Sequence, residues 1–188
     1  ARLTISAYEN LVSAAERRKL INGSKDTVIR VSDFVGVIPA ITGKVELVYE
    51  GEQEGPGIVA ANLISKAIRT QFINFFPDPE KIRKNKKTEN PYKTISDWFG
   101  KGNMLDLLLD ASDKEYKETL HSVPGLSDLV TAKFKKEPEA YQLFLMELAL
   151  HGLAEYSLLS KHALEEGIQF KDLISSMFNL EDHAAEDL

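Results

Sequence analysis

The strongest constraint on the fold is a run of apolar residues at helical spacing between Pro56 and Pro77. Its members recur every three or four residues and therefore share one face of a helix. They are Ala60, Ile64, Ala67, Ile68, Phe72 and Phe75. Pro56 suits the first turn of a helix, whereas Pro77 cannot continue one. The pattern predicts a helix that starts after Pro56, stops near Pro77 and buries one apolar face.

The segment before this run also has helical features. Ser6 and Glu9 have the spacing of a capping box, in which each side chain bonds a free backbone amide of the first turn. A helix over about residues 4–20 can end at Gly23, because glycine readily takes the left-handed conformation. Residues 43–50 alternate imperfectly between apolar and polar, and we favour a helix there over a strand because the neighbouring segments are helical.

The part of the chain after Pro91 is predicted to be helical as well. Ser112 and Glu115 form a second capping box, and a long apolar stretch runs from Pro138 to near Gly167. A last helix is expected to bury Phe170, Leu173, Ile174, Met177 and Phe178. The sequence therefore predicts an all-α fold.

A basic segment, residues 77–93, separates these helices into two groups. It is rich in lysine and arginine, with Lys81, Arg83, Lys84, Lys86 and Lys87. It holds few apolar residues, so we interpret it as a solvated linker. Residues 1–76 would form one helical unit, and residues 94–188 would form a helical extension that folds independently and recognises a partner.

Composition excludes several classes of function. The net charge of −6 argues against broad nucleic-acid binding, and the basic segment lacks the interleaved aromatic residues of a single-strand site. No run reaches the ~18 uncharged apolar residues that a membrane helix needs, so no membrane partner is expected. The chain has no cysteine, which excludes disulfides and thiolate chemistry and suits the cytoplasm.

Few residues suggest chemistry of their own. Glu147, His151 and Glu155 share one helix face, but no second helix repeats the motif, so we interpret them as a buried polar seam and predict no metal site. The glycines between Gly51 and Gly57 lack the Lys-Ser/Thr end of a phosphate-binding loop. No strained nucleophile turn indicates a Ser/His/Asp triad, so we predict no catalytic residue.

Four stretches within the first 52 residues resemble a known family. They are ARLTISAYENL (1–11), AAERR (14–18), VSDF (31–34) and AITGKVELVYEGE (40–52). They resemble the lid subdomain of AAA+ ATPases of the MoxR and magnesium-chelatase I-subunit group, including bacterial proteins described as magnesium-chelatase-like or sigma-54-interacting ATPases. The resemblance covers about the first 75 residues. It implies that residues 1–76 are a helical lid and that residues 94–188 are a small helical bundle attached to it.

The resemblance also implies a role for Arg2. In that family a sensor-2 arginine stands at the head of the first lid helix, and Arg2 is the matching position here. A guanidinium there can reach the γ-phosphate of ATP and report the nucleotide state through movement of the lid. The full-length parent would bind ATP and Mg²⁺, form a ring with neighbouring subunits and remodel a client protein.

The nucleotide-binding core of such an ATPase would lie before Ala1, where the chain opens without an initiator methionine. We therefore expect a C-terminal fragment that is non-catalytic alone and binds no cofactor. Two alternatives stay open. One is a free-standing helical protein-interaction module without nucleotide binding, and the weaker one is a metal-dependent bundle enzyme that uses Glu147, His151 and Glu155.

Overall fold

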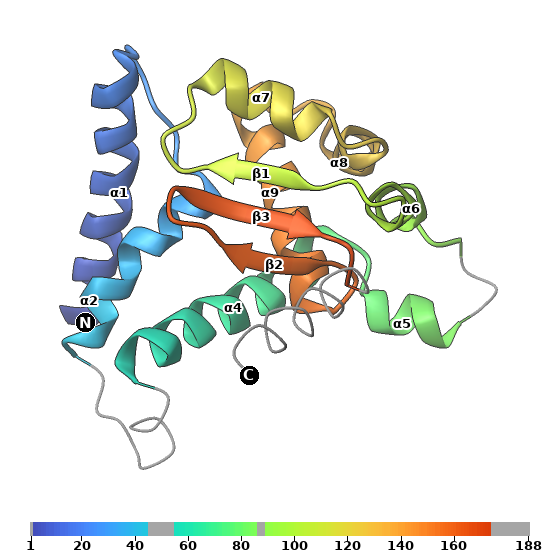
Figure 1. Cartoon of the computed structure of the whole chain (residues 1–188), viewed down its shortest axis with the longest axis horizontal. Helices are drawn as coiled ribbons and strands as arrows, with labels where there is room; N and C mark the ends of the chain where they lie inside the picture. The colour runs from blue at the N-terminus through green and yellow to red at the C-terminus, as the bar shows by residue number, and fades with distance from the viewer. Residues whose placement is uncertain (1, 45–54, 86–88, 174–188) are drawn as a thin grey trace, which may run out of the picture.

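The computed structural model describes residues 2–44, 55–85 and 89–173 of the chain (Figure 1). It is mostly helical, as predicted, but it also contains a three-stranded antiparallel sheet. The elements in chain order are α1 (Arg2–Asn22), η1 (Val31–Val37), α2 (Ile38–Thr42), α4 (Pro56–Phe75), α5 (Pro79–Lys84), α6 (Lys93–Gly100), β1 (Leu105–Leu108), α7 (Asp113–His121), α8 (Leu126–Phe134), α9 (Glu139–Glu155), β2 (Ser160–Ala163) and β3 (Gly167–Lys171).

Helix α1 confirms the predicted first helix, with one difference at its start. It ends at Asn22, and Gly23 has the expected positive φ of 62°. Its first turn begins at Arg2, so Ser6 lies inside the helix and the predicted Ser6–Glu9 capping box is wrong. Most of the segment 43–50, for which a helix was favoured, lies outside the described residues.

Helix α4 spans Pro56–Phe75, as the apolar run predicts. Ala60, Ile68 and Phe72 are its buried residues, and the helix packs against α2 and α9. The Ser112–Glu115 capping box is also confirmed, since each of the two side chains accepts a hydrogen bond from the other residue's backbone amide.

The described part of segment 77–93 contains a short helix, α5, whose basic residues Lys81, Arg83 and Lys84 are exposed. Asp78 caps α5 by accepting a hydrogen bond from the Glu80 amide. The buried Tyr92 hydroxyl donates to the Pro77 carbonyl, and Arg83 Nη2 donates to the Tyr156 carbonyl at 3.4 Å. The local indication of this helix is Asp78 followed by Pro79, a common helix start. The interpretation as a linker gave weight to the many charged residues instead. Lys86 and Lys87 lie outside the described residues.

The sheet is the main departure from the all-α prediction. Its strand order is β1-β3-β2, with both pairs antiparallel. The apolar stretch after Pro138 is helical only to Glu155, and Phe170, expected in a last helix, is buried in β3. These strands are only four or five residues long, so each shows too little alternation to identify it. β2 and β3 pair as neighbours along the chain, whereas β1 pairs with a strand about 60 residues later.

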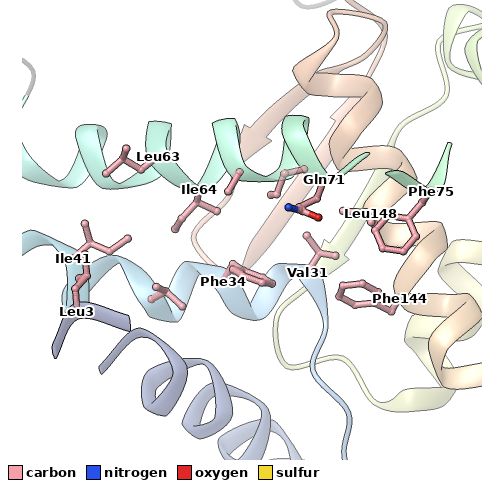
Figure 2. A pocket seen from close by; sticks show the side chains of 13 residues that line it. Leu3, Val31, Phe34, Ile41, Leu63, Ile64, Gln71, Phe75, Phe144 and Leu148 are labelled. Atoms are coloured by element: carbon pink, nitrogen blue, oxygen red, sulfur yellow. The ribbon is translucent and has the colours of Figure 1, made fainter. Parts of the chain in front are cut away.

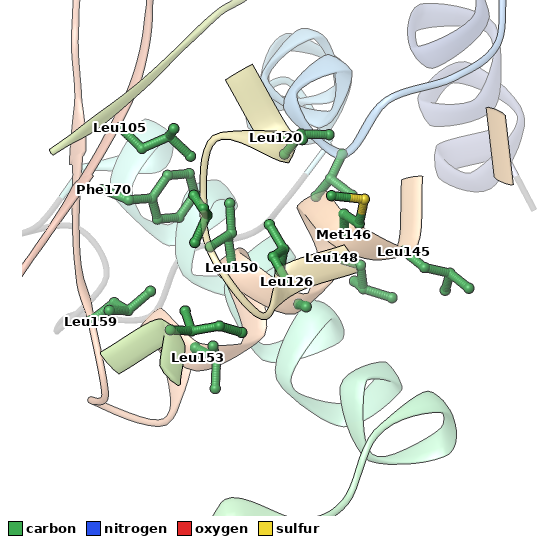
Figure 3. Close-up of a cluster of buried hydrophobic side chains, with 14 of the residues drawn as sticks. Leu105, Leu120, Leu126, Leu145, Met146, Leu148, Leu150, Leu153, Leu159 and Phe170 are labelled. Carbon is green, nitrogen blue, oxygen red and sulfur yellow. The ribbon is translucent and has the colours of Figure 1, made fainter. Parts of the chain in front are cut away.

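Helix α9 lies at the centre of the hydrophobic core and is buried nearly all round. Figure 3 shows its leucines packed with Leu105 of β1, Phe170 of β3, Leu120 of α7 and Leu126 of α8. The same cluster includes Val31 and Phe72 from the N-terminal part. The division of the chain at residues 77–93 stays a prediction, but this shared core argues against independent folding of residues 94–188.

None of the helices in the described ranges is both long enough and apolar enough to cross a bilayer.

Candidate functional site

Arg2, the predicted sensor-2 residue, is exposed at the first turn of α1. Figure 1 shows this end of α1 beside α2. The neighbouring residue, Leu3, contributes to the wall of an apolar cavity described below. At the other end of α1, Arg17 forms a two-fold hydrogen-bonded ion pair with Asp110, at 2.7 Å for each bond. Within the described residues, no hydrogen bond or ion pair of this kind holds the Arg2 side chain.

Glu147, one of the three seam residues, has no exposed surface and joins α9 to the start of η1. Its Oε1 accepts a hydrogen bond from the Ser32 amide at 2.8 Å, and its Oε2 accepts from the Val31 amide at 2.7 Å. The Tyr116 hydroxyl also donates to Oε2, at 2.8 Å. Burial raises the pKa of Glu147, and these three donors act in the opposite direction by stabilising the carboxylate. Glu147 thus satisfies backbone amides that a helix start leaves unpaired.

Arg30 makes a second connection between the N-terminal part and α7. Its side chain is almost fully buried, and its guanidinium lies 4.0 Å from the centre of the Tyr116 ring. It donates to the Ala111 carbonyl and to the Asp113 carboxylate, both at 2.8 Å. These contacts hold the segment before η1 against the start of α7.

Arg18 and Asp33 form a buried ion pair between α1 and η1. Arg18 Nη2 also donates to the Val28 carbonyl at 2.6 Å, and Asp33 accepts from the Arg30 amide at 2.7 Å. We refer to the buried contacts made by Glu147, Arg30, Arg18 and Asp33 as the η1 junction. This junction holds α1, η1, α7 and α9 in one arrangement.

The three seam residues do not converge on a common point. Glu147 is occupied by the η1 junction, while Glu155 pairs with Lys161 at 2.7 Å. His151 Nε2 lies 3.8 Å from Glu147 Oε1, beyond hydrogen-bond distance. Within the described ranges, no group of three or more His, Asp or Glu side chains is arranged to hold a metal ion. The interpretation as a buried polar seam fits Glu147 and His151, and Glu155 is partly buried.

An apolar cavity of about 490 Å³ lies between α4 on one side and η1 with α2 on the other (Figure 2). We call it the α4 cavity. Its wall includes Val31, Phe34, Ile41, Leu63, Ile64, Ile68, Phe75, Phe144 and Leu148. Gln71 supplies the only side-chain amide among the residues that line it. Its volume is in the range of ligand-binding pockets.

A second cavity, of about 230 Å³, adjoins the first and shares Val31, Phe34, Ile64 and Ile68 with it. We call it the His151 cavity, because His151 forms part of its wall together with Lys161 and Ser65. The sequence singled out His151 but not this cavity. Its walls come from η1, α2, α4, α9, β2 and β3, so no local pattern could have indicated it.

His151 should make the protein's stability depend on pH. Burial lowers the pKa of His151 to about 3 from the ordinary 6.5, and Lys161 adds a smaller repulsion. Unfolding therefore takes up a proton between these values, and the wild type loses stability as the pH falls. Relative to His151→Leu, we expect the wild type to lose about 2 kcal/mol between roughly pH 7 and pH 5.

Urea unfolding of both proteins at the two pH values tests this. Glu147, whose pKa is raised, titrates in both proteins with the opposite sign, so the difference between them reports His151. The same substitution at His121, an exposed residue, should leave the pH dependence unchanged. A pH-independent difference between wild type and His151→Leu would contradict a buried neutral imidazole.

Comparison of the chain with family models, curated proteins and solved structures finds no match. The family resemblance in the first 75 residues is therefore a basis for a proposal only.

Proposed function

We propose that the chain is the C-terminal part of a MoxR or magnesium-chelatase-like AAA+ ATPase, and that it contributes a sensor-2 lid and a helical partner-recognition region. Two observations support this. The four matching stretches lie in the first 52 residues, and Arg2 stands exposed at the head of the first helix. An exposed arginine in this position is available to a phosphate group bound by a neighbouring part of the protein.

The observation that carries the proposal furthest is the η1 junction. It links α1 and η1, which include part of the matching region, to α7 and α9 of the extension through buried charged hydrogen bonds. Such contacts are costly to break because each would leave a buried polar group without a partner. A displacement of α1 on nucleotide hydrolysis would therefore carry the extension with it, and with it any client protein bound there.

In this proposal ATP with Mg²⁺ supplies the transferred phosphoryl group in the longer protein, and this chain supplies Arg2. Arg2 would stabilise negative charge that develops on the phosphate oxygens. The partners would be neighbouring subunits of a ring and a client protein, in the cytoplasm. The chain on its own should not hydrolyse ATP, because one arginine cannot replace the backbone amides and lysine of a phosphate-binding loop.

Arg2→Ala in the longer protein should slow ATP hydrolysis by roughly ten- to a hundredfold, less than the 10³ or more of an arginine finger. Nucleotide affinity should change less, because the interaction strengthens as the phosphoryl group transfers. Steady-state turnover and nucleotide titration measure the two effects separately. Lys25→Ala, which removes an exposed positive charge near the far end of α1, should leave both unchanged.

Unchanged turnover in Arg2→Ala would remove the sensor-2 assignment and favour a helical interaction module. Micromolar binding of ATP by the isolated chain, measured by calorimetry, would contradict its interpretation as a lid without a nucleotide-binding core.

A further inference from the structure

His151 is a buried polar side chain without a hydrogen-bond partner. It is 3% exposed, and neither ring nitrogen has a partner among the described residues. Buried side-chain nitrogens are hydrogen-bonded in the large majority of cases, and an exception calls for a specific cause. Because the ring forms part of the wall of the His151 cavity, a bound molecule could supply the missing hydrogen bond.

The space next to His151 suits an apolar molecule larger than water. The His151 cavity and the α4 cavity share four lining residues, all apolar. They therefore adjoin along the gap between η1 and α4, and their combined wall has few polar groups. A ligand that reaches His151 with a polar end would have apolar surface around the rest of its length.

The charges near His151 favour a neutral polar end. Lys161 is already paired with Glu155, and the buried Glu147 carboxyl lies 3.8 Å from the ring. An anionic group would meet Glu147, and a cationic group would lose its hydration next to Lys161. With its pKa lowered by burial, His151 is neutral near pH 7 and offers one N–H donor and one acceptor nitrogen. A hydroxyl group, which both donates and accepts, matches this ring.

We propose that the His151 cavity is a binding site for a neutral, mainly apolar molecule with a single hydroxyl group. The hydroxyl bonds the His151 imidazole, and the apolar body lies along α4 between Phe34 and Ile64. This site is independent of the ATPase proposal, because Arg2, the predicted nucleotide-contacting residue, does not line the cavity. A medium-chain alcohol is the simplest molecule of this class.

The test is a titration of the whole chain with three probes of equal length: 1-octanol, octanoate and octylamine. Calorimetry and the NMR signals of the His151 ring measure binding. We expect 1-octanol to bind, to shift the His151 signals, and to bind at least tenfold more tightly than the two charged probes. His151→Leu should weaken 1-octanol binding at least tenfold, or about 1.4 kcal/mol. His121→Leu, the same substitution at an exposed histidine, should leave it unchanged.

A second variant keeps the test decisive if His151→Leu does not fold. Ile64→Trp adds bulk at a residue shared by both cavities without removing the imidazole, and it should also abolish binding. Failure of 1-octanol to bind the wild type would overturn the proposal and leave water as the occupant. Equal binding of octanoate, or full binding by a folded His151→Leu or Ile64→Trp variant, would overturn it too.

Discussion

Replacement of Glu147 by alanine should lower the free energy of unfolding by roughly 3–5 kcal/mol, the cost of removing one partner from a buried charged network. The substitution removes the acceptor for three donors: the Val31 amide, the Ser32 amide and the Tyr116 hydroxyl. Glu147 itself has no exposed surface. The substitution also opens space beside the Tyr116 hydroxyl, and the Arg30 guanidinium stacks on the ring of that tyrosine. Chemical denaturation followed by circular dichroism measures the loss.

Two variants show whether the loss comes from these hydrogen bonds. Tyr116→Phe removes only the hydrogen bond from the Tyr116 hydroxyl to Glu147, and the two amide bonds remain. It should lower the free energy of unfolding by about 1 kcal/mol. Glu139→Ala truncates an exposed glutamate in the first turn of the same helix, and its effect should be close to zero. If Glu147→Ala costs no more than Tyr116→Phe, the η1 junction does not depend on the Glu147 carboxylate.

Gly152→Ala should destabilise the protein by about 3 kcal/mol, near the upper end of overpacking costs. A Cβ atom at Gly152 would lie 2.0 Å from Cδ2 and 2.6 Å from Cγ of Phe72. Phe72 is fully buried, and its ring lies 5.2 Å from that of Phe76 and 5.6 Å from that of Tyr156, which limits its movement. The clash outweighs the gain of about 1 kcal/mol that alanine usually brings inside a helix.

Thermal and urea unfolding of two further variants check this explanation. Gly57→Ala, in the first turn of α4, adds a methyl group with no atom within 4 Å and should be neutral or slightly stabilising. The double variant Gly152→Ala with Phe72→Leu should be destabilised by less than the sum of the two single changes, because the smaller side chain relieves the clash. A Gly152→Ala protein as stable as Gly57→Ala would show that α4 and α9 do not pack this closely.

The Gly152 contact and the η1 junction both bear on how movement of the N-terminal helices reaches α9. Both join the N-terminal helices to α9, one through α4 and the other through η1. If the chain belongs to an ATPase as proposed above, a variant at either place that stays folded but loosens this connection should separate ATP hydrolysis from client remodelling. Turnover would then persist while remodelling fails.

Local patterns in the sequence were sufficient for several helices and their ends. The bounds of α4, the turn at Gly23 and the Ser112–Glu115 capping box depend on residues within one or two helical turns of each other. Helix periodicity, proline, glycine and capping side chains act over this range, so the sequence alone reveals them. The mainly helical character of the chain followed from these features.

The pairing of β1 with β3 and the candidate sites depend instead on contacts between distant residues. β3 pairs with β1 about 60 residues earlier, and Gly167 is required because its neighbour there is the Leu107 carbonyl, 2.4 Å from where a Cβ would lie. The sequence identified Glu147 and His151 as a polar seam on one helix. Only the tertiary structure gave them different roles, because η1 brings two free amides to Glu147, whereas His151 faces a cavity and has no hydrogen-bond partner among the described residues.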